Sequence, residues 1–321
     1  MRCLVATLGV FLLLGASVAA ASGVPEGFQG NGYLDPVDRG ITLPHGYGEL
    51  GLGYRSTWGN FSYDLDGSRI QGERLVPFRS YRDQASVLAG AYGLTDTWEI
   101  GFEVPFVWRR FHIDRGDLVD TEGRLITAYP DDRTSGMGDA RFHTVVRPWE
   151  RVGLRFDLKT ATGADNFFPT RMPDARPVRY IGSGQPNIDV AVMGEHVRER
   201  YRLDGALGYR FRLSGISNFL LDDFAPRDEF FLTGAARVRL HPNAGIGAEA
   251  SYMHEVAANS VSVLDVRVPV WLSVGPWELR VSGTTPVYGK DYPALFPEQL
   301  ADPRPLLGPG VEVFVFYRIH E

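Results

Sequence analysis

The clearest pattern in the chain is a strict alternation of residue types between Trp98 and Arg109. Every second position is tryptophan, isoleucine, phenylalanine or valine, and charged, small or other residues stand between them. A period of two residues is typical of a β-strand, whereas a helix repeats every 3.6 residues. The apolar face begins with Trp98 and ends with Trp108, and aromatic residues at both ends of such a run are typical of strands that cross a membrane.

The same alternation recurs in other parts of the chain. It extends over 49–58, 152–159, 201–211, 229–240, 245–252 and 311–318. Short connections lie at 95–97, 149–151, 198–200, 241–243 and 275–276. Long connections cover 60–82, 111–137, 163–184, 214–227 and 289–309, with a shorter one near 254–259. Outer-membrane barrels have short periplasmic turns and long external loops. The sequence therefore predicts an all-β fold, a transmembrane antiparallel up-and-down β-barrel of about 12 strands with both termini in the periplasm.

A soluble β-sandwich is the alternative fold, because its strands also alternate. Strands of soluble proteins average about five to six residues, whereas the alternating runs of this chain extend to about eleven, the length that crosses a bilayer. Greek-key connections are also not expected to alternate between short and long. Both observations favour the barrel.

The first 21 residues have the pattern of a secretory signal peptide. Arg2 precedes an apolar core over 4–14, and the alanines at 19–21 supply the small residues that favour cleavage before Ser22. An uncleaved membrane anchor is the alternative, which the short apolar core disfavours. The only cysteine, Cys3, lies inside this segment, so disulfides are not predicted in the mature chain. No later run approaches the 18 apolar residues of a transmembrane helix.

Residues 22–46 do not alternate and are rich in glycine and proline, so this segment is predicted to be irregular. Two interpretations stay open: a periplasmic tail, or a segment that enters the barrel and plugs it. The barrel itself is assigned to residues 47–321.

The face opposite the apolar one carries many charges of both signs. If the apolar face contacts lipid, these side chains line the lumen: Glu99, Glu103, Arg109, Asp139, Arg141, His143, Arg147, Arg155, Asp157, Lys159, Arg202, Asp204, Arg237, Arg239 and Glu249. The lipid-facing aromatic girdle is assigned to Trp58, Trp98, Trp108, Tyr201 and Tyr209. The charges could form a salt-bridge lattice that fills the interior, or an acidic wall facing a basic wall along a hydrated path.

Motifs that carry chemistry are weak in this chain. The stretch Gly46–Gly51 matches G-x-G-x-x-G, but it opens a strand and no helix follows, so a dinucleotide site is not predicted. The seven histidines have no metal-ligand spacing, and neither a metal nor a cofactor is predicted. Ser251 and His254 are close only in sequence; no catalytic residues are predicted, and an outer-membrane lipid hydrolase is the less favoured alternative. The net charge of −6 gives no reason to expect nucleic acid as a partner.

Three segments carry a resemblance to a known family. Thr134–Arg141 contains a G-x-G-D strand start, Leu154–Gly163 ends a strand with K-x-x-T-G, and Gly182–Val190 begins the next strand after Gly-Ser-Gly. Together they resemble the outer-membrane family named after the meta-pathway of phenol degradation. The resemblance implies a transporter of small aromatic or hydrophobic compounds and no catalytic residues.

The expected function is therefore passive passage or uptake of small solutes across the bacterial outer membrane. The expected partners are outer-membrane lipid, a small solute and the barrel assembly machinery. A structural or adhesive barrel with a sealed lumen is the alternative. Many such barrels end on an aromatic residue that the assembly machinery reads, whereas here Tyr317 is followed by four further residues.

Overall fold

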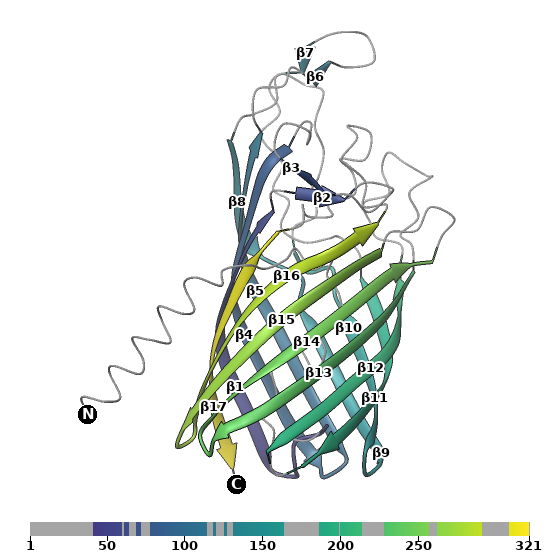
Figure 1. Cartoon of the computed structure of the whole chain (residues 1–321), viewed down its shortest axis with the longest axis vertical. Helices are drawn as coiled ribbons and strands as arrows, with labels where there is room; N and C mark the ends of the chain where they lie inside the picture. Colours follow the sequence, from purple (N-terminus) through teal and green to yellow (C-terminus); the bar gives the residue numbers. More distant parts are fainter. Residues whose placement is uncertain are drawn as a thin grey trace, which may run out of the picture.

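The computed structural model describes residues 41–59, 61–63, 69–71, 78–113, 118–119, 125–126, 131–163, 186–198, 200–213, 228–256, 262–290 and 308–320. The expected signal peptide at 1–21 and most of the segment 22–46 lie outside these residues. No helix that is long and apolar enough to cross a membrane is found in the described ranges. Their regular structure consists of β-strands (Figure 1).

Thirteen of these strands form one sheet. They are β1 (Tyr47–Gly59), β4 (Phe78–Thr95), β5 (Trp98–Ile113), β8 (Asp131–Met137), β9 (Arg141–Trp149), β10 (Val152–Lys159), β11 (Asn187–Val197), β12 (Tyr201–Arg212), β13 (Glu229–His241), β14 (Ala244–Glu255), β15 (Ser262–Val274), β16 (Trp277–Lys290) and β17 (Gly310–His320). Two small hairpins lie in the connections: β2 (Phe61–Tyr63) with β3 (Arg69–Gln71), and β6 (Leu118–Val119) with β7 (Leu125–Ile126).

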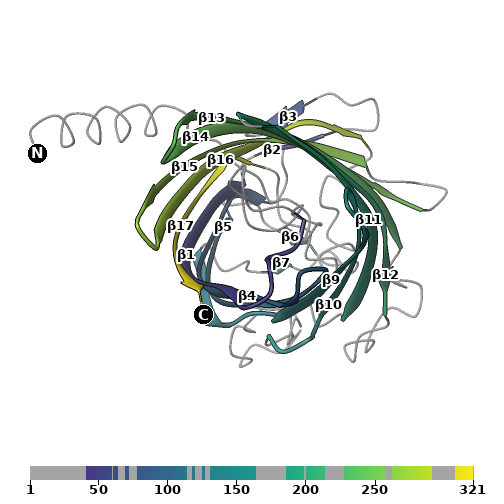
Figure 2. The same ribbon diagram turned by 90° about the horizontal axis from the view of Figure 1, so that it is seen from below.

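The sheet closes on itself, as Figure 2 shows from below. β1 pairs with both β4 and β17, with Tyr47 opposite His320, and β4 also pairs with β5. β8 and β9 share one place in the wall, because the upper part of β5 pairs with β8 and its lower part with β9. The described residues thus form a closed antiparallel up-and-down barrel with twelve strand positions, which confirms the predicted fold class.

The connections alternate in length, as the sequence predicts. Two-residue turns join β4 to β5, β13 to β14 and β15 to β16, and Gly275 in the last of these has a positive φ of 59°. Long connections lie at the opposite end of the barrel (Figure 1). The end with the short turns is here called the periplasmic end, following the rule for outer-membrane barrels.

Exposure alternates along the strands and separates two faces. Leu52 is 68 % exposed and Trp98 45 %, whereas Glu99, the next residue after Trp98, is 2 % exposed. The buried face is the inner one, because its side chains reach over an intervening strand: Arg55 on β1 contacts Glu103 on β5, with β4 between them. The outer face is therefore mostly apolar and the inner face largely charged, the arrangement of a barrel embedded in lipid.

Large inner side chains lie over glycines of the neighbouring strand. The rings of Phe314 and Phe316 stack on each other with centroids 5.5 Å apart. They cover Gly53 and Gly51, where an added Cβ would collide with the rings. Gly51 belongs to the G-x-G-x-x-G stretch, so this glycine provides space for a ring rather than a nucleotide turn. Aromatic residues over strand glycines stabilise a curved sheet and fix its register.

Candidate functional site: the barrel interior

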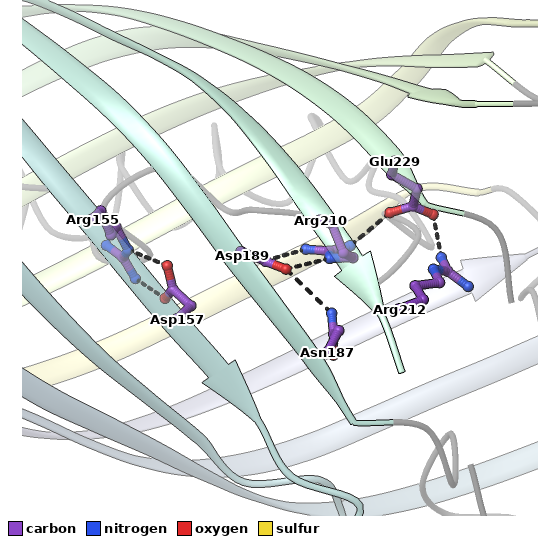
Figure 3. A network of polar contacts seen from close by, with 7 residues as sticks. All are labelled: Arg155, Asp157, Asn187, Asp189, Arg210, Arg212 and Glu229. Carbon is purple, nitrogen blue, oxygen red and sulfur yellow. Dashed lines mark hydrogen bonds and ion pairs between the residues drawn. The ribbon is translucent and has the colours of Figure 1, made fainter. Parts of the chain in front are cut away.

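The largest ion-pair network described in full lies on the inner face of β10 to β13 (Figure 3). Arg210 binds Asp189 through two hydrogen bonds of 2.7 and 2.6 Å and Glu229 through one of 2.8 Å. Glu229 also binds Arg212, and Asn187 donates to Asp189 at 3.4 Å. Nearby on β10, Arg155 binds Asp157 through two hydrogen bonds of 2.7 Å. Paired forks of this kind hold planar groups in fixed orientations.

A second network joins β1, β5, β15, β16 and β17. Arg55 binds Glu103 and also Glu312, the latter at 3.1 Å, and Glu312 lies 3.4 Å from Arg267. On the same side of the barrel, Arg280 lies 3.2 Å from Glu49 and also binds Glu278, which in turn binds Arg318. The guanidinium of Arg280 lies 4.1 Å above the ring of Phe316, within the range of a cation–π interaction.

A third group connects β11, β12 and β13. Arg202 lies 3.2 Å from Glu195 and 3.9 Å from Asp204, and Asp204 also binds Arg237. In all three networks acidic and basic side chains intermix. Among the described residues, the charges are not separated into an acidic wall and a basic wall, so the geometry favours the lattice interpretation.

The two motifs at the start of β9 and the end of β10 meet in a compact polar contact. The hydroxyl of Thr162 accepts from the amide of Ala140 at 2.9 Å and donates to the carbonyl of Gly138 at 3.1 Å. Asp139 accepts from the amide of Gly163 at 3.0 Å and lies 3.6 Å from the ammonium of Lys159. The G-x-G-D and K-x-x-T-G motifs thus fix the break between β8 and β9 against the end of β10.

Residues 41–46 precede β1 and cross the inner face at the periplasmic end. The amide of Leu43 donates to Glu99 at 2.8 Å, and the hydroxyl of Thr42 donates to the carbonyl of Asp96 at 3.0 Å. Ile41 is only 1 % exposed and packs in a cluster with side chains from four wall strands, Val145, Ala191, Met193, Ala206 and Phe231. This described end of the segment 22–46 therefore lies inside the barrel.

The structure places most of the expected lumen-lining residues on the inner face. Buried there are Glu99, Asp139, His143, Arg155, Lys159, Arg202, Arg237 and Glu249, and half-buried are Glu103, Arg141, Arg147, Asp157, Asp204 and Arg239. The side chain of Arg109 lies outside the described part. Arg147 sits at the periplasmic turn, where it donates to the carbonyl of Asp96 at 2.7 Å. His143 lies 3.4 Å from Glu99.

The expected girdle residues lie on the opposite face. Trp98, Trp108 and Tyr201 are exposed, whereas Trp58 and Tyr209 are half-buried. Trp58 lies beneath the guanidinium of Arg82 at 5.6 Å, and Tyr209 donates to Asp228 at 3.1 Å.

Sequence reasoning did not identify the apolar residues of the interior. Val87, Ala89 and Val107 cluster there with Phe314 and Phe316, and the cluster around Ile41 is a second such group. The signal that could have found Phe314 and Phe316 is their parity, since they stand at the same alternate positions as Glu312 and Arg318.

Ser251 and His254 are not brought together, because they stand at positions of opposite parity on β14. His254 contacts Ser262 instead, with 2.8 Å between its Nδ1 and the hydroxyl oxygen. Within the described ranges, no group of three or more histidine, cysteine or acidic residues is placed to hold a metal ion.

A closed antiparallel barrel with an apolar, aromatic-rich outer face and a charged inner face defines a barrel of the bacterial outer-membrane class. The chain belongs to the family described as "Putative MetA-pathway of phenol degradation", whose model matches residues 59–292. This match confirms the resemblance that the motifs at 134–190 carry.

Comparison with solved structures supports the same fold. An outer membrane channel of the COG4313 group from Pseudomonas putida F1 is similar over 89 % of this chain and 100 % of its own, with a TM-score of 0.62 and 14 % identity. The translocator domain of the autotransporter NalP from Neisseria meningitidis is similar over 88 % and 90 %, with a TM-score of 0.48 and 9 % identity. The CymD monoaromatic hydrocarbon channel covers 94 % of each chain, with a TM-score of 0.46 and 10 % identity. No curated protein sequence matches the chain.

Proposed function

We propose that the protein is an outer-membrane channel that gives small, uncharged hydrophobic or aromatic solutes passive passage. The observation that carries this proposal is the apolar lining within a charged interior. Val87, Phe314 and Phe316 point inward and cluster on neighbouring strands, although the lipid face already provides an apolar environment for such side chains. An interior that bound only ions or water would gain nothing from them.

The ion-pair lattice is consistent with an uncharged solute. Each network described above brings carboxylates and guanidinium groups within about 4 Å of each other, so that their fields largely cancel at longer range. Such a lining does not strongly attract ions of one sign. The family membership and the P. putida structure, which is named as an outer membrane channel, agree with the proposal.

A sealed structural barrel is the second candidate. Arg202, Arg210 and Glu278 are at most 1 % exposed, which is what a lattice that fills the interior would show. Residues 41–46 also occupy the inner face at the periplasmic end. We therefore propose that the segment 22–46 acts as a plug whose described end, 41–46, must move before a solute passes.

The proposal includes the route to the membrane. Cleavage after Ala21 would release the mature chain into the periplasm, where the barrel assembly machinery would insert it with outer-membrane lipid around its apolar face. Mass determination of the mature N-terminus tests the cleavage site, with Ser22 as the expected first residue.

The test of passage compares the refolded full-length mature chain with a variant that lacks residues 22–44. Step conductance in planar bilayers and uptake of toluene into vesicles are measured for both. We expect low or intermittent conductance for the full chain, and larger, steadier conductance with faster uptake for the deletion. Absence of both conductance and uptake in both proteins would remove the channel proposal and leave the sealed barrel.

A further inference from the structure

The side chain of Ile41 fills an apolar site that the barrel wall provides. Its neighbours come from separate strands: Val145 from β9, Ala191 and Met193 from β11, Ala206 from β12 and Phe231 from β13. All five are buried and none is charged. The site is therefore a depression on the inner face, lined by methyl groups, a thioether and one aromatic ring.

The wall has a specific space for this side chain. Gly153 on β10 lies beneath Ile41, and an added Cβ at position 153 would come within 2.7 Å of Ile41 Cγ2. A glycine at this place in a strand lacks side-chain packing of its own, so that another group can approach the backbone closely. In this structure the approaching group is an isoleucine side chain.

Ile41 is not part of the wall that forms the site. No strand pairing involves residues 41–46, and their printed hydrogen bonds lie on the other side, at the end of β4 and the start of β5. Pro44 and Leu43 lie over Gly93 there. The segment is thus anchored at the β4–β5 turn, and Ile41 reaches from it into the site.

We infer that this site binds the hydrophobic part of a solute, and that Ile41 occupies it as an internal competitor. A side chain on a short segment can leave without breaking the wall, and the vacated site would suit a small uncharged aliphatic or monocyclic aromatic group. Apolar cavities of this kind take up molecules such as benzene. This inference rests on the proposed function and identifies one site within it.

Competition has a measurable consequence. If Ile41 fills the site nine-tenths of the time, the apparent affinity for an external ligand falls about tenfold. Replacing Ile41 by alanine keeps the segment and its hydrogen bonds but removes most of the competing side chain. The variant should therefore bind a small aromatic probe about tenfold more tightly than the unmodified chain.

The experiment uses the refolded mature chain with 13C-labelled methionine methyl groups and toluene as the probe. Met193 lines the site and reports on it directly. Met253 is also buried on the inner face but belongs to neither apolar cluster, so its signal is the control within the same spectrum. A Met193→Leu variant assigns the signal.

We expect toluene to shift the Met193 signal in Ile41→Ala at about one-tenth of the concentration needed in the unmodified chain, while Met253 stays in place. A second variant, Ala206→Leu, fills the site and should abolish the shift. Equal titrations with and without Ile41, or no shift at Met193 in Ile41→Ala, would overturn the inference. Binding is measured without transport, so uptake without a Met193 shift refutes only this site, and a shift without uptake refutes only the channel.

Discussion

Arg210 is bound to Asp189 by two hydrogen bonds and is almost completely buried between β11 and β13. Replacement of Arg210 by methionine should lower the free energy of unfolding by about 3 to 5 kcal/mol, because Asp189 and Glu229 would keep their charges without this partner. Urea unfolding in lipid vesicles measures the change. The double variant with Asp189→Asn should recover part of the loss, and an Arg210→Met protein as stable as the parent would contradict the assigned lattice.

Gly51 tests the ring packing of the interior. An alanine at this position would collide with the ring of Phe316, so Gly51→Ala should destabilise the barrel by about 1 to 3 kcal/mol. The matched control is Gly234→Ala, because no atom lies within 4 Å of the added Cβ there. The temperature at which the folded band disappears on an unheated gel compares the two. Equal shifts for both variants would speak against close contact between Phe316 and β1.

A disulfide between Ile41→Cys and Gly153→Cys would show that the segment before β1 lies on β10. The sequence after residue 21 contains no cysteine, so the new pair has no competitor in the mature chain. Mild oxidation should produce a faster band on a non-reducing gel, and reduction should raise conductance. The pair Ile41→Cys and Gly194→Cys is the control, since Gly194 is exposed on the outer side of β11. No cross-link with position 153 would place residue 41 elsewhere.

Thr162 tests the contact between the two family motifs. Thr162→Val loses both hydroxyl hydrogen bonds, to Ala140 and to Gly138, and should cost about 1 kcal/mol. Amide hydrogen exchange at Ala140 should accelerate, because its acceptor is gone. Thr162→Ser keeps the hydroxyl and should exchange like the parent. Unchanged exchange in Thr162→Val would mean that the motif acts in another way.

Glu249 differs from the other inner carboxylates. It is buried, and one of its oxygens has no hydrogen-bond partner among the described residues. The arginine opposite it on β15, Arg267, points to Glu312. Glu249→Gln should therefore raise the free energy of unfolding by about 1 kcal/mol or more, because it removes a buried charge that no ion pair offsets. Urea unfolding measures this.

The contrasting variant is Glu229→Gln, which should lower stability because Glu229 binds both Arg210 and Arg212. Opposite signs for the two glutamine variants are expected. A loss of stability of the same size at both positions would show that Glu249 has a partner in solution.

The wall of the barrel could be predicted from the sequence because strand alternation is local. The run from Trp98 to Trp108 shows both its strand character and its lipid-facing side within eleven positions. β4 is less clear, since its inner face carries Ala85, Val87 and Ala89 and its outer face carries Gln84 and Ser86. There the simple assignment of apolar residues to lipid does not hold.

The pairing of the charges could not be predicted, because it depends on register between strands far apart in sequence. Arg280 and Glu49 are separated by 231 positions and meet only when β17 closes the ring between them. The site around Ile41 has the same character. Its members are alanine, valine, methionine and phenylalanine at ordinary inner positions, and only the three-dimensional structure brings residue 41 to them.

The pairing of β1 with β17 gives the wall no intrinsic first strand. Tyr47 and His320 stand opposite each other at the end of the barrel that carries the short turns. A few glycines and serines could join them, and new termini could open in an external loop such as the one before β13. The same ring would then arise from a circularly permuted gene, with residues 41–46 detached from the strand that now holds them in place.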